Sequence, residues 1–94
     1  MLSIGTSHIA ILRKALGLSQ LEFGQLFGVH LMTVSKWERG ITAPSAYQLA
    51  LIHEFERAAA AGSNRMKSEL KQMLVGQGVA AALLLLLDTA ATKG

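Results

Sequence analysis

The sequence predicts an all-α fold, and three observations indicate it. Apolar residues recur at helical spacing in successive segments of the chain. Serine or proline precedes several of these segments and glycine follows them, as is typical of helix ends. The composition, with 51% hydrophobic residues, 16% charged residues and a single Pro, is that of a globular chain with apolar surface to cover. One compact unit fits the length of 94 residues.

Five helices and a C-terminal segment are expected, at residues 8–16, 20–27, 31–39, 44–61, 65–75 and 79–87. The first has apolar residues at helical spacing and ends at Gly17. The second begins with "SQLE", a capping-box pattern in which Ser19 and Glu22 satisfy amide donors of the first turn. It ends at Gly28, and His30 is the expected cap of the third helix.

The later segments are more apolar than a single helix face requires. Pro44 and Ser45 open the fourth helix, whose apolar residues occupy more than one narrow stripe. The fifth is amphipathic. The run "VAAALLLLL" at 79–87 favours a helix by its Ala and Leu content, and a buried strand is the alternative. This run is well short of the roughly 20 residues that span a bilayer, so no membrane association is expected.

Composition and motif content exclude several classes of function. The chain has no Cys and its three His lack the spacing of a metal site, so neither a metal nor another cofactor is expected. No acid–base pair and no nucleophile with its base is recognisable, so an enzyme is not expected. The start of the chain has no secretory pattern, which predicts a cytoplasmic protein. A net charge of +3 and a pI near 9.7 permit binding to a polyanion.

The segment between the second and third helices has the features of a helix-turn-helix. Two short helices that meet at a steep angle need a small residue where their backbones approach, a turn residue, and an apolar residue after it. Gly24, Gly28 and Val29 meet these demands in order. Gly24 costs about 1 kcal/mol of helix propensity relative to Ala, so its place inside a helix favours a crowded contact.

Residues 9–55 resemble the Cro and phage-repressor type of helix-turn-helix domain. The resemblance rests on "LGLSQLEFGQLFGV" and "TVSKWERG", followed by the single Pro. It implies a five-helix, lambda-repressor-like fold, with the helix-turn-helix DNA-binding domain at residues 1–62. Residues 63–94 are then an apolar, helical C-terminal extension that serves dimerisation. The same kind of domain occurs in phage regulators and in antitoxins of toxin–antitoxin pairs.

By this resemblance the helix at 31–39 is the recognition helix, which lies in the major groove while the helix at 20–27 crosses the DNA backbone. Base edges are expected to be read by Leu31, Met32, Thr33 and Lys36. Contacts to the DNA backbone are expected from Gln20, Lys14, Ser35, Trp37, Arg39, Thr42 and Ala43. Arg13 and Glu38 match a structural ion pair that ties the first helix to the third.

Some of these assignments leave alternatives open. Leu31 and Met32 stand where polar residues are usual, so they either pack on thymine methyl groups or contact a protein neighbour. Trp37 is either a core residue or one whose indole N–H also reaches a phosphate. Gln20 either contacts the DNA backbone or braces the first recognition residue.

One recognition helix covers only a few base pairs, so a homodimer on half-sites about 34 Å apart is expected. Its interface is predicted at Leu70, Met73, Leu74, Val79, Leu83, Leu84, Leu86 and Leu87, with an intramolecular core as the alternative. The predicted function is a sequence-specific transcriptional repressor that binds double-stranded DNA, with its own operator as one candidate site. The alternative is an antitoxin that binds a toxin through its C-terminal segment and autoregulates its operon.

Overall fold

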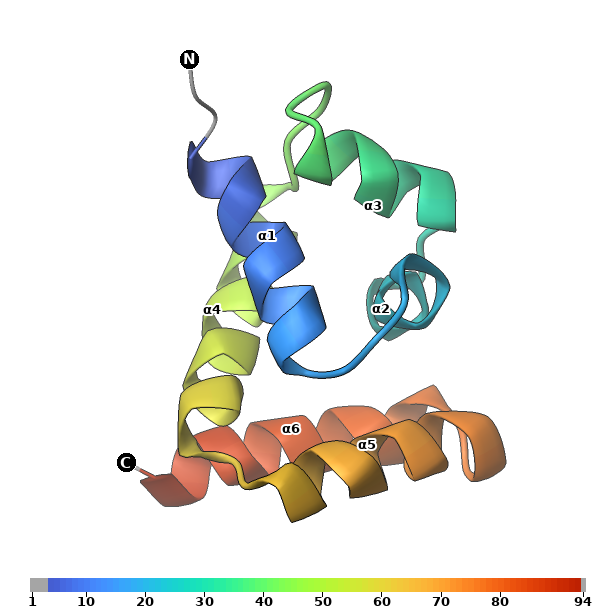
Figure 1. The fold of residues 1–94 in the computed structure, drawn as a ribbon, viewed down its shortest axis with the longest axis vertical. Helices are drawn as coiled ribbons and strands as arrows, with labels where there is room; N and C mark the ends of the chain where they lie inside the picture. The colour runs from blue at the N-terminus through green and yellow to red at the C-terminus, as the bar shows by residue number, and fades with distance from the viewer. Residues whose placement is uncertain (1–3, 94) are drawn as a thin grey trace.

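The computed structural model describes residues 4–93 of the chain, and side chains from 8 to 91. Within these residues there are six helices and no strand (Figure 1). The helices are α1 Ile4–Ala15, α2 Gln20–Phe27, α3 Leu31–Glu38, α4 Ala46–Ala61, α5 Asn64–Gly76 and α6 Val79–Lys93.

Local capping signals set the ends of the short helices. The Ser19 hydroxyl accepts a hydrogen bond from the Glu22 amide at 3.1 Å, and Glu22 Oε1 accepts one from the Ser19 amide at 2.9 Å. These two bonds form the capping box that the sequence predicts. Gly28 ends α2 with a positive φ of 68°, a conformation that glycine adopts without steric cost. His30 caps α3, since its Nδ1 accepts a hydrogen bond from the Met32 amide at 3.0 Å.

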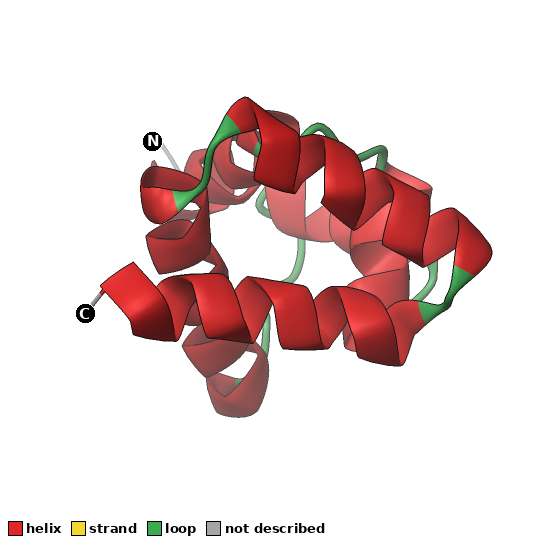
Figure 2. Ribbon diagram, turned by 90° about the horizontal axis from the view of Figure 1, so that it is seen from below, coloured by secondary structure: helices red, strands yellow, loops and turns green. Residues whose placement is uncertain are grey.

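The helices are arranged so that α3 and the pair α5–α6 occupy opposite ends of the molecule. The Cα atoms extend over 35 × 27 × 22 Å, and Figure 1 shows α3 at one end of the longest dimension and α5 and α6 at the other. Seen from below, α5 and α6 run side by side and form the layer nearest the viewer (Figure 2). The helices α1 and α4 connect the two ends.

One buried apolar cluster lies between these ends and takes residues from all six helices. The half-buried ring of Phe27 packs against this cluster, with ring centroids 5.0 Å from Phe23, 5.6 Å from Trp37 and 5.4 Å from Phe55. Tilted and edge-to-face contacts at these distances are favourable for aromatic rings. Because α2, α3 and α4 meet through these rings, the core fixes the position of α3, which is too short to be stable alone.

The C-terminal segment is helical in the structure. The favoured helix at 79–87 lies within α6, and the strand alternative is excluded. α6 packs against α4, α5 and α2. The expected boundary between 62 and 63 falls in the turn between α4 and α5, and the buried cluster continues across it.

The residues predicted as a dimer interface fall into three groups in the structure. Leu70, Leu74 and Leu86 are 0%, 8% and 0% exposed within one chain, so we correct their assignment from interface to core. These residues of α5 and α6 belong to the buried cluster of one chain. Half-buried against the same core are Met73, Val79 and Leu83. Only Leu84 and Leu87 of the predicted set are exposed, at 69% and 38%.

The described residues contain no helix that is both long enough and apolar enough to cross a membrane. The most apolar helix, α6, has only 15 residues.

Gly24 is required by the close approach of α2 to the start of α3. A Cβ atom at this position would lie 2.6 Å from the backbone oxygen of Val29. We therefore expect Gly24→Ala to lower the free energy of unfolding by about 1 to 3 kcal/mol, although alanine favours the helix by about 1 kcal/mol. Thermal denaturation followed by circular dichroism measures the change.

The matched control is Gly76→Ala in α5, where an added Cβ meets nothing within 4 Å. This control is expected to leave stability unchanged or slightly raised, because only the propensity gain applies. Equal effects of the two substitutions would show that the α2–α3 contact is not crowded.

Candidate nucleic-acid interface

The turn between α2 and α3 holds the two helices at a fixed angle. The Val29 amide donates to the Gly24 carbonyl at 3.0 Å, and the Gly28 amide donates to the Gln25 carbonyl at 3.3 Å. On the other side of the turn, Val34 is fully buried and lies close to Gly24. These contacts leave the opposite side of α3 free to face a ligand.

That exposed side of α3 is a narrow edge formed by Met32, Lys36 and Arg39. The spacing of four and three residues places the three side chains in one line on a helix. The opposite side carries the buried Val34 and Trp37. Since α3 lies at one end of the molecule, its exposed edge points away from the core (Figure 1).

The four residues expected to read bases do not share one environment. Met32 is 48% exposed and Lys36 is exposed, so both lie on the outer edge. Leu31 and Thr33 are half-buried on the two flanks of this edge. The structure thus brings Met32 and Lys36 together at the centre of the surface and places the other two at its borders.

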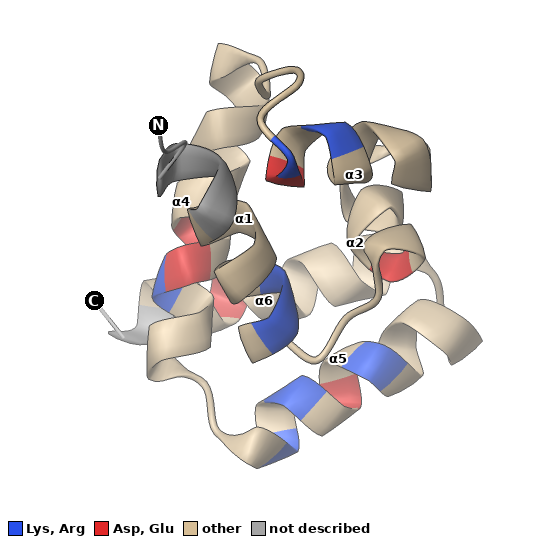
Figure 3. Ribbon diagram, turned by 45° about the horizontal axis from the view of Figure 1, so that its top comes forward, with Lys and Arg blue, Asp and Glu red and all other residues tan. Residues whose placement is uncertain are grey.

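Exposed cationic residues lie on α3 and at the end of α1. Lys14 and Arg39 are exposed, and Figure 3 shows cationic positions on α3 and at the end of α1. Arg39 Nε donates to the Ser35 carbonyl at 3.3 Å and to its hydroxyl at 3.1 Å, which aligns the guanidinium along α3. These are three of the residues expected to contact the DNA backbone.

The loop after α3 offers fewer free amides than expected. Thr42 and Ala43 are both exposed. The amide of Thr42 already points to the Lys36 carbonyl at 3.5 Å, and that of Ile41 donates to the same oxygen at 2.9 Å. The loop is thereby tied to the end of α3, and Ala43 keeps an amide without an acceptor among the described residues.

Two residues expected at the DNA backbone have structural roles. Trp37 is 2% exposed and packs edge-to-face on Phe27, so it belongs to the core, and a contact of its indole N–H with a phosphate stays a prediction. Gln20 is half-buried, and its Nε2 donates to Glu38 Oε1 at 3.0 Å. Gln20 thus links α2 to the end of α3, and its contact with the DNA backbone stays a prediction.

Gln20 belongs to a polar network centred on Glu38. Arg13 Nε lies 2.6 Å from Glu38 Oε2, and its second terminal nitrogen donates to Oε1 at 3.2 Å. The first terminal nitrogen of Arg13 donates to the Leu18 carbonyl at 3.0 Å. These are the two residues that the resemblance implied as a pair. With side chains only 13% and 9% exposed, they join α1, α2 and α3 in one rigid unit.

The network keeps Glu38 ionised. Burial raises the pKa of the Glu38 carboxyl, but hydrogen bonds from Arg13 and Gln20 and the charges of Arg13 and Lys14 lower it by more. The pKa of Glu38 therefore lies below its ordinary value of 4.5. As a paired carboxylate it does not repel an anion at the adjoining edge of α3.

A second link, from α5, could not be read from the sequence. Lys71 Nζ donates to the Gly17 carbonyl at 3.1 Å and lies 3.4 Å from Glu22 Oε1. The hydrogen bond from the Ser19 amide lowers the pKa of Glu22, and Lys71 lowers it further against the effect of burial. Lys71 thus attaches α5 to the start of α2 and to the turn before it. Lys71 and Gly17 are 54 residues apart in the sequence, so no local sequence pattern predicts their contact.

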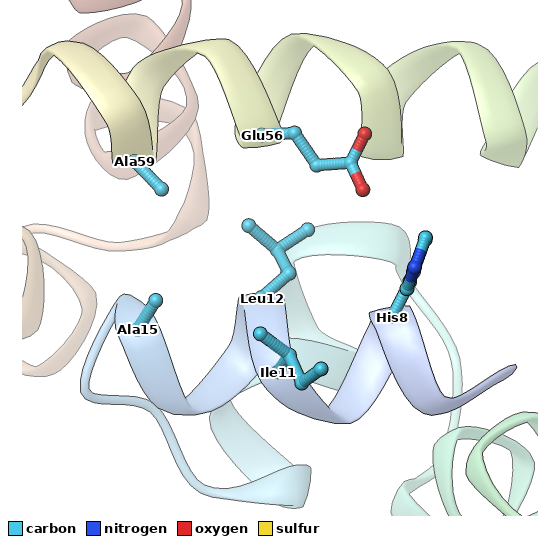
Figure 4. A pocket seen from close by; sticks show the side chains of 6 residues that line it. All are labelled: His8, Ile11, Leu12, Ala15, Glu56 and Ala59. Carbon is cyan, nitrogen blue, oxygen red and sulfur yellow. The ribbon is translucent and has the colours of Figure 1, made fainter. Parts of the chain in front are cut away.

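An apolar cleft of about 380 Å³ lies apart from this surface, between α1 and α4. Its walls come from Ile11, Leu12 and Ala15 of α1 and from Ala59 of α4. His8 and Glu56 lie together at one end of it (Figure 4). The cleft contributes no residue to the exposed edge of α3.

A family model described as helix-turn-helix matches residues 9–55, which is half of the chain. Neither the curated proteins nor the solved structures contain a match to this sequence. The matched segment contains the α2–turn–α3 unit, the exposed edge of α3 and both members of the Arg13–Glu38 pair. The chain belongs to the helix-turn-helix family, of the Cro and phage-repressor type, and is a DNA-binding transcription regulator.

Proposed function

We propose that this protein is a sequence-specific repressor that acts as a homodimer and reads the major groove of its operator with α3. Repression follows from occupancy, because a protein seated on a promoter excludes other proteins from it. The observation that carries the proposal is the exposed edge of Met32, Lys36 and Arg39 at one end of the molecule. An α-helix with a free polar edge fits the width of the major groove.

The charges around α3 support an anionic ligand. Between residues 4 and 45 the only carboxylates are Glu22 and Glu38. Each has a cationic partner, Lys71 and Arg13 respectively. Lys14, Lys36 and Arg39 therefore face a duplex without an unpaired carboxylate among them, which favours contact with phosphates.

The edge combines two kinds of base contact. Lys36 is long enough to donate to the O6 and N7 atoms of guanine, and the exposed Met32 supplies an apolar group for a thymine methyl. Selection of bound duplexes from a random pool tests the proposal directly, because it reports the recognised sequence. Recovery of unrelated sequences, with equal affinity for all of them, would contradict sequence-specific binding.

Lys36→Ala is expected to change the preference of the protein at one or two base pairs. The loss of a base contact costs about 1 to 3 kcal/mol, or about 5- to 150-fold in affinity for the selected duplex. Fluorescence anisotropy with the selected duplex and with single-base variants measures this change. Lys14→Ala is expected to weaken all duplexes alike and to reduce the salt dependence.

The matched control for Lys36→Ala is Arg65→Ala, which removes the same charge from the outer end of α5. Arg65 is 88% exposed and lies at the end of the molecule opposite α3. This control is expected to bind within about twofold of the natural chain, because distant exposed charges are screened. Equal losses for both variants would assign the effect to net charge alone.

The antitoxin alternative requires apolar surface on residues 63–94 for a toxin. Most of the large apolar residues of that segment are buried or half-buried within the chain, and Leu70, Leu74 and Leu86 are among the buried ones. We therefore favour the repressor, with its own operator as one site. A footprint of the protein on the DNA upstream of its own gene tests autoregulation.

A further inference from the structure

The outer side of α6 carries a regular apolar stripe that no part of the described chain covers. Its members are Ala80, Leu84, Leu87 and Ala91, all exposed, with Leu84 at 69%. Their spacing of four, three and four residues is that of the seam of a coiled coil. The other side of α6 carries the buried Ala82, Leu86 and Ala90. A helix with apolar residues on both sides is suited to contact a second partner.

The order of residues in this stripe, here called the α6 stripe, fits a second copy of the same chain. Along the stripe, the order Ala80, Leu84, Leu87, Ala91 is the same when it is followed in either direction. An antiparallel copy of α6 therefore sets Leu84 of one chain against Leu87 of the other, and Ala80 against Ala91. Small residues at both ends and large ones at the centre give the self-complementary surface that a two-fold contact needs.

Charge also favours self-association through this stripe. A two-fold contact brings each group near its own copy, so a charged residue at its centre would meet a like charge. The chain has no charged residue from 72 to 87, and Asp88 lies on the flank of the stripe. An uncharged apolar stripe loses nothing to repulsion when it meets its own copy.

The position of the α6 stripe determines what such a dimer does. The buried faces of α3 and α6 turn toward one common cluster from opposite ends of the molecule. Their exposed faces therefore point away from each other. Two copies joined through α6 therefore hold their α3 edges at the two far ends of the dimer.

We infer that the homodimer forms through the α6 stripe and bridges two separate segments of DNA. A single straight duplex cannot touch both α3 edges, because they face in opposite directions. Adjacent half-sites about 34 Å apart need both edges on the same side instead. The inference rests on the proposed DNA binding by α3, and it gives the regulator a second activity, the pairing of two distant operators.

The rival contact for a second copy lies beside α3. Ile41 and Tyr47, 57% and 73% exposed, follow α3 closely in the chain. A two-fold contact there would place two α3 helices on one duplex. Substitutions of similarly exposed residues separate the two possibilities, namely Leu84→Glu in the α6 stripe, Tyr47→Glu in the rival patch, and Ile11→Glu on α1 as a control at 63% exposure.

The first test measures the mass of the full chain in solution without DNA, by sedimentation. The natural chain, Tyr47→Glu and Ile11→Glu are expected at twice the 10.0 kDa of one chain, and Leu84→Glu at the mass of one chain. Circular dichroism checks that Leu84→Glu is folded, as expected for a residue at the surface. The inference is overturned if the natural chain sediments with the mass of one chain. It is also overturned if Tyr47→Glu loses the dimer while Leu84→Glu keeps it.

The second test measures bridging with the duplex recovered by selection. An immobilised copy of this duplex is expected to capture a second, fluorescent copy through the natural chain. Leu84→Glu is expected to lower this capture at least tenfold and to change affinity for one duplex less than twofold. Occupation of two adjacent half-sites on one duplex, without capture of the second, overturns bridging.

The two tests also separate failure of this inference from failure of the proposed function. If selection recovers no preferred sequence, sequence-specific DNA binding fails while the mass measurement still reports on the α6 contact. If selection succeeds and Leu84→Glu remains a dimer, the function stands and the α6 contact fails.

Discussion

Replacing Glu38 with alanine is expected to lower the free energy of unfolding by about 3 to 5 kcal/mol, because it breaks a mostly buried ion pair. The substitution removes the acceptor for two nitrogens of Arg13 and for the Gln20 amide. Arg13 then keeps only the Leu18 carbonyl as a partner. Denaturant titration of the natural chain and the variant measures the difference.

The matched control for Glu38→Ala is Glu69→Ala, which breaks the exposed pair with Arg65. Those side chains are 46% and 88% exposed, and the distance between Arg65 Nε and Glu69 Oε2 is 3.6 Å. An exposed pair between residues four apart on a helix stabilises by less than about 1 kcal/mol. Similar losses for both variants would show that the burial of Glu38 contributes nothing.

The effect of Glu38→Ala is also expected to depend on pH. The pKa of Glu38 in the folded chain lies below 4.5, so the folded state favours the ionised carboxyl. The contribution of Glu38 to stability is complete at a pH above the pKa of the unfolded state. It is lost as the pH falls through the pKa of the folded state. The difference in stability between the two chains should shrink below about pH 4.5. A constant difference down to pH 3 would contradict this account.

The helix-turn-helix was predictable because its signals are local. The capping box of Ser19 and Glu22, the turn at Gly28 and the crowded Gly24 each follow from a few neighbouring residues. The His30 cap is equally local. For this reason the expected bounds of the second helix agree with α2, and the third differs from α3 by one residue.

The remaining features depend on tertiary contacts that no local pattern records. An apolar stripe looks the same whether its own chain or a second copy covers it, so Leu70 and Leu86 were assigned to an interface and lie in the core. Gln20 and Lys71 are polar residues whose partners lie 18 and 54 residues away. Only the folded arrangement shows that one pairs with Glu38 and the other with Glu22 and Gly17.

Trp37→Ala is expected to cost about 3 to 5 kcal/mol of stability, the usual effect of removing a large aromatic side chain from a core. The indole is 2% exposed and packs edge-to-face on Phe27 at 5.6 Å between ring centroids. The free energy of unfolding of a domain of this size is about 5 to 15 kcal/mol in total, so much of the variant would unfold on mild heating. Thermal denaturation measures the loss.

Trp37→Phe separates the core role of this residue from a contact with phosphate. Phenylalanine keeps an aromatic ring against Phe27 and removes the N–H donor. If Trp37 acts only in the core, the folded variant binds the selected duplex within about twofold of the natural chain, while its stability falls by less than in Trp37→Ala. A folded Trp37→Phe that loses tenfold in affinity at low salt would restore the indole as a DNA contact. Its burial on the inner side of α3, opposite Lys36, argues for the first result, because that side faces the core.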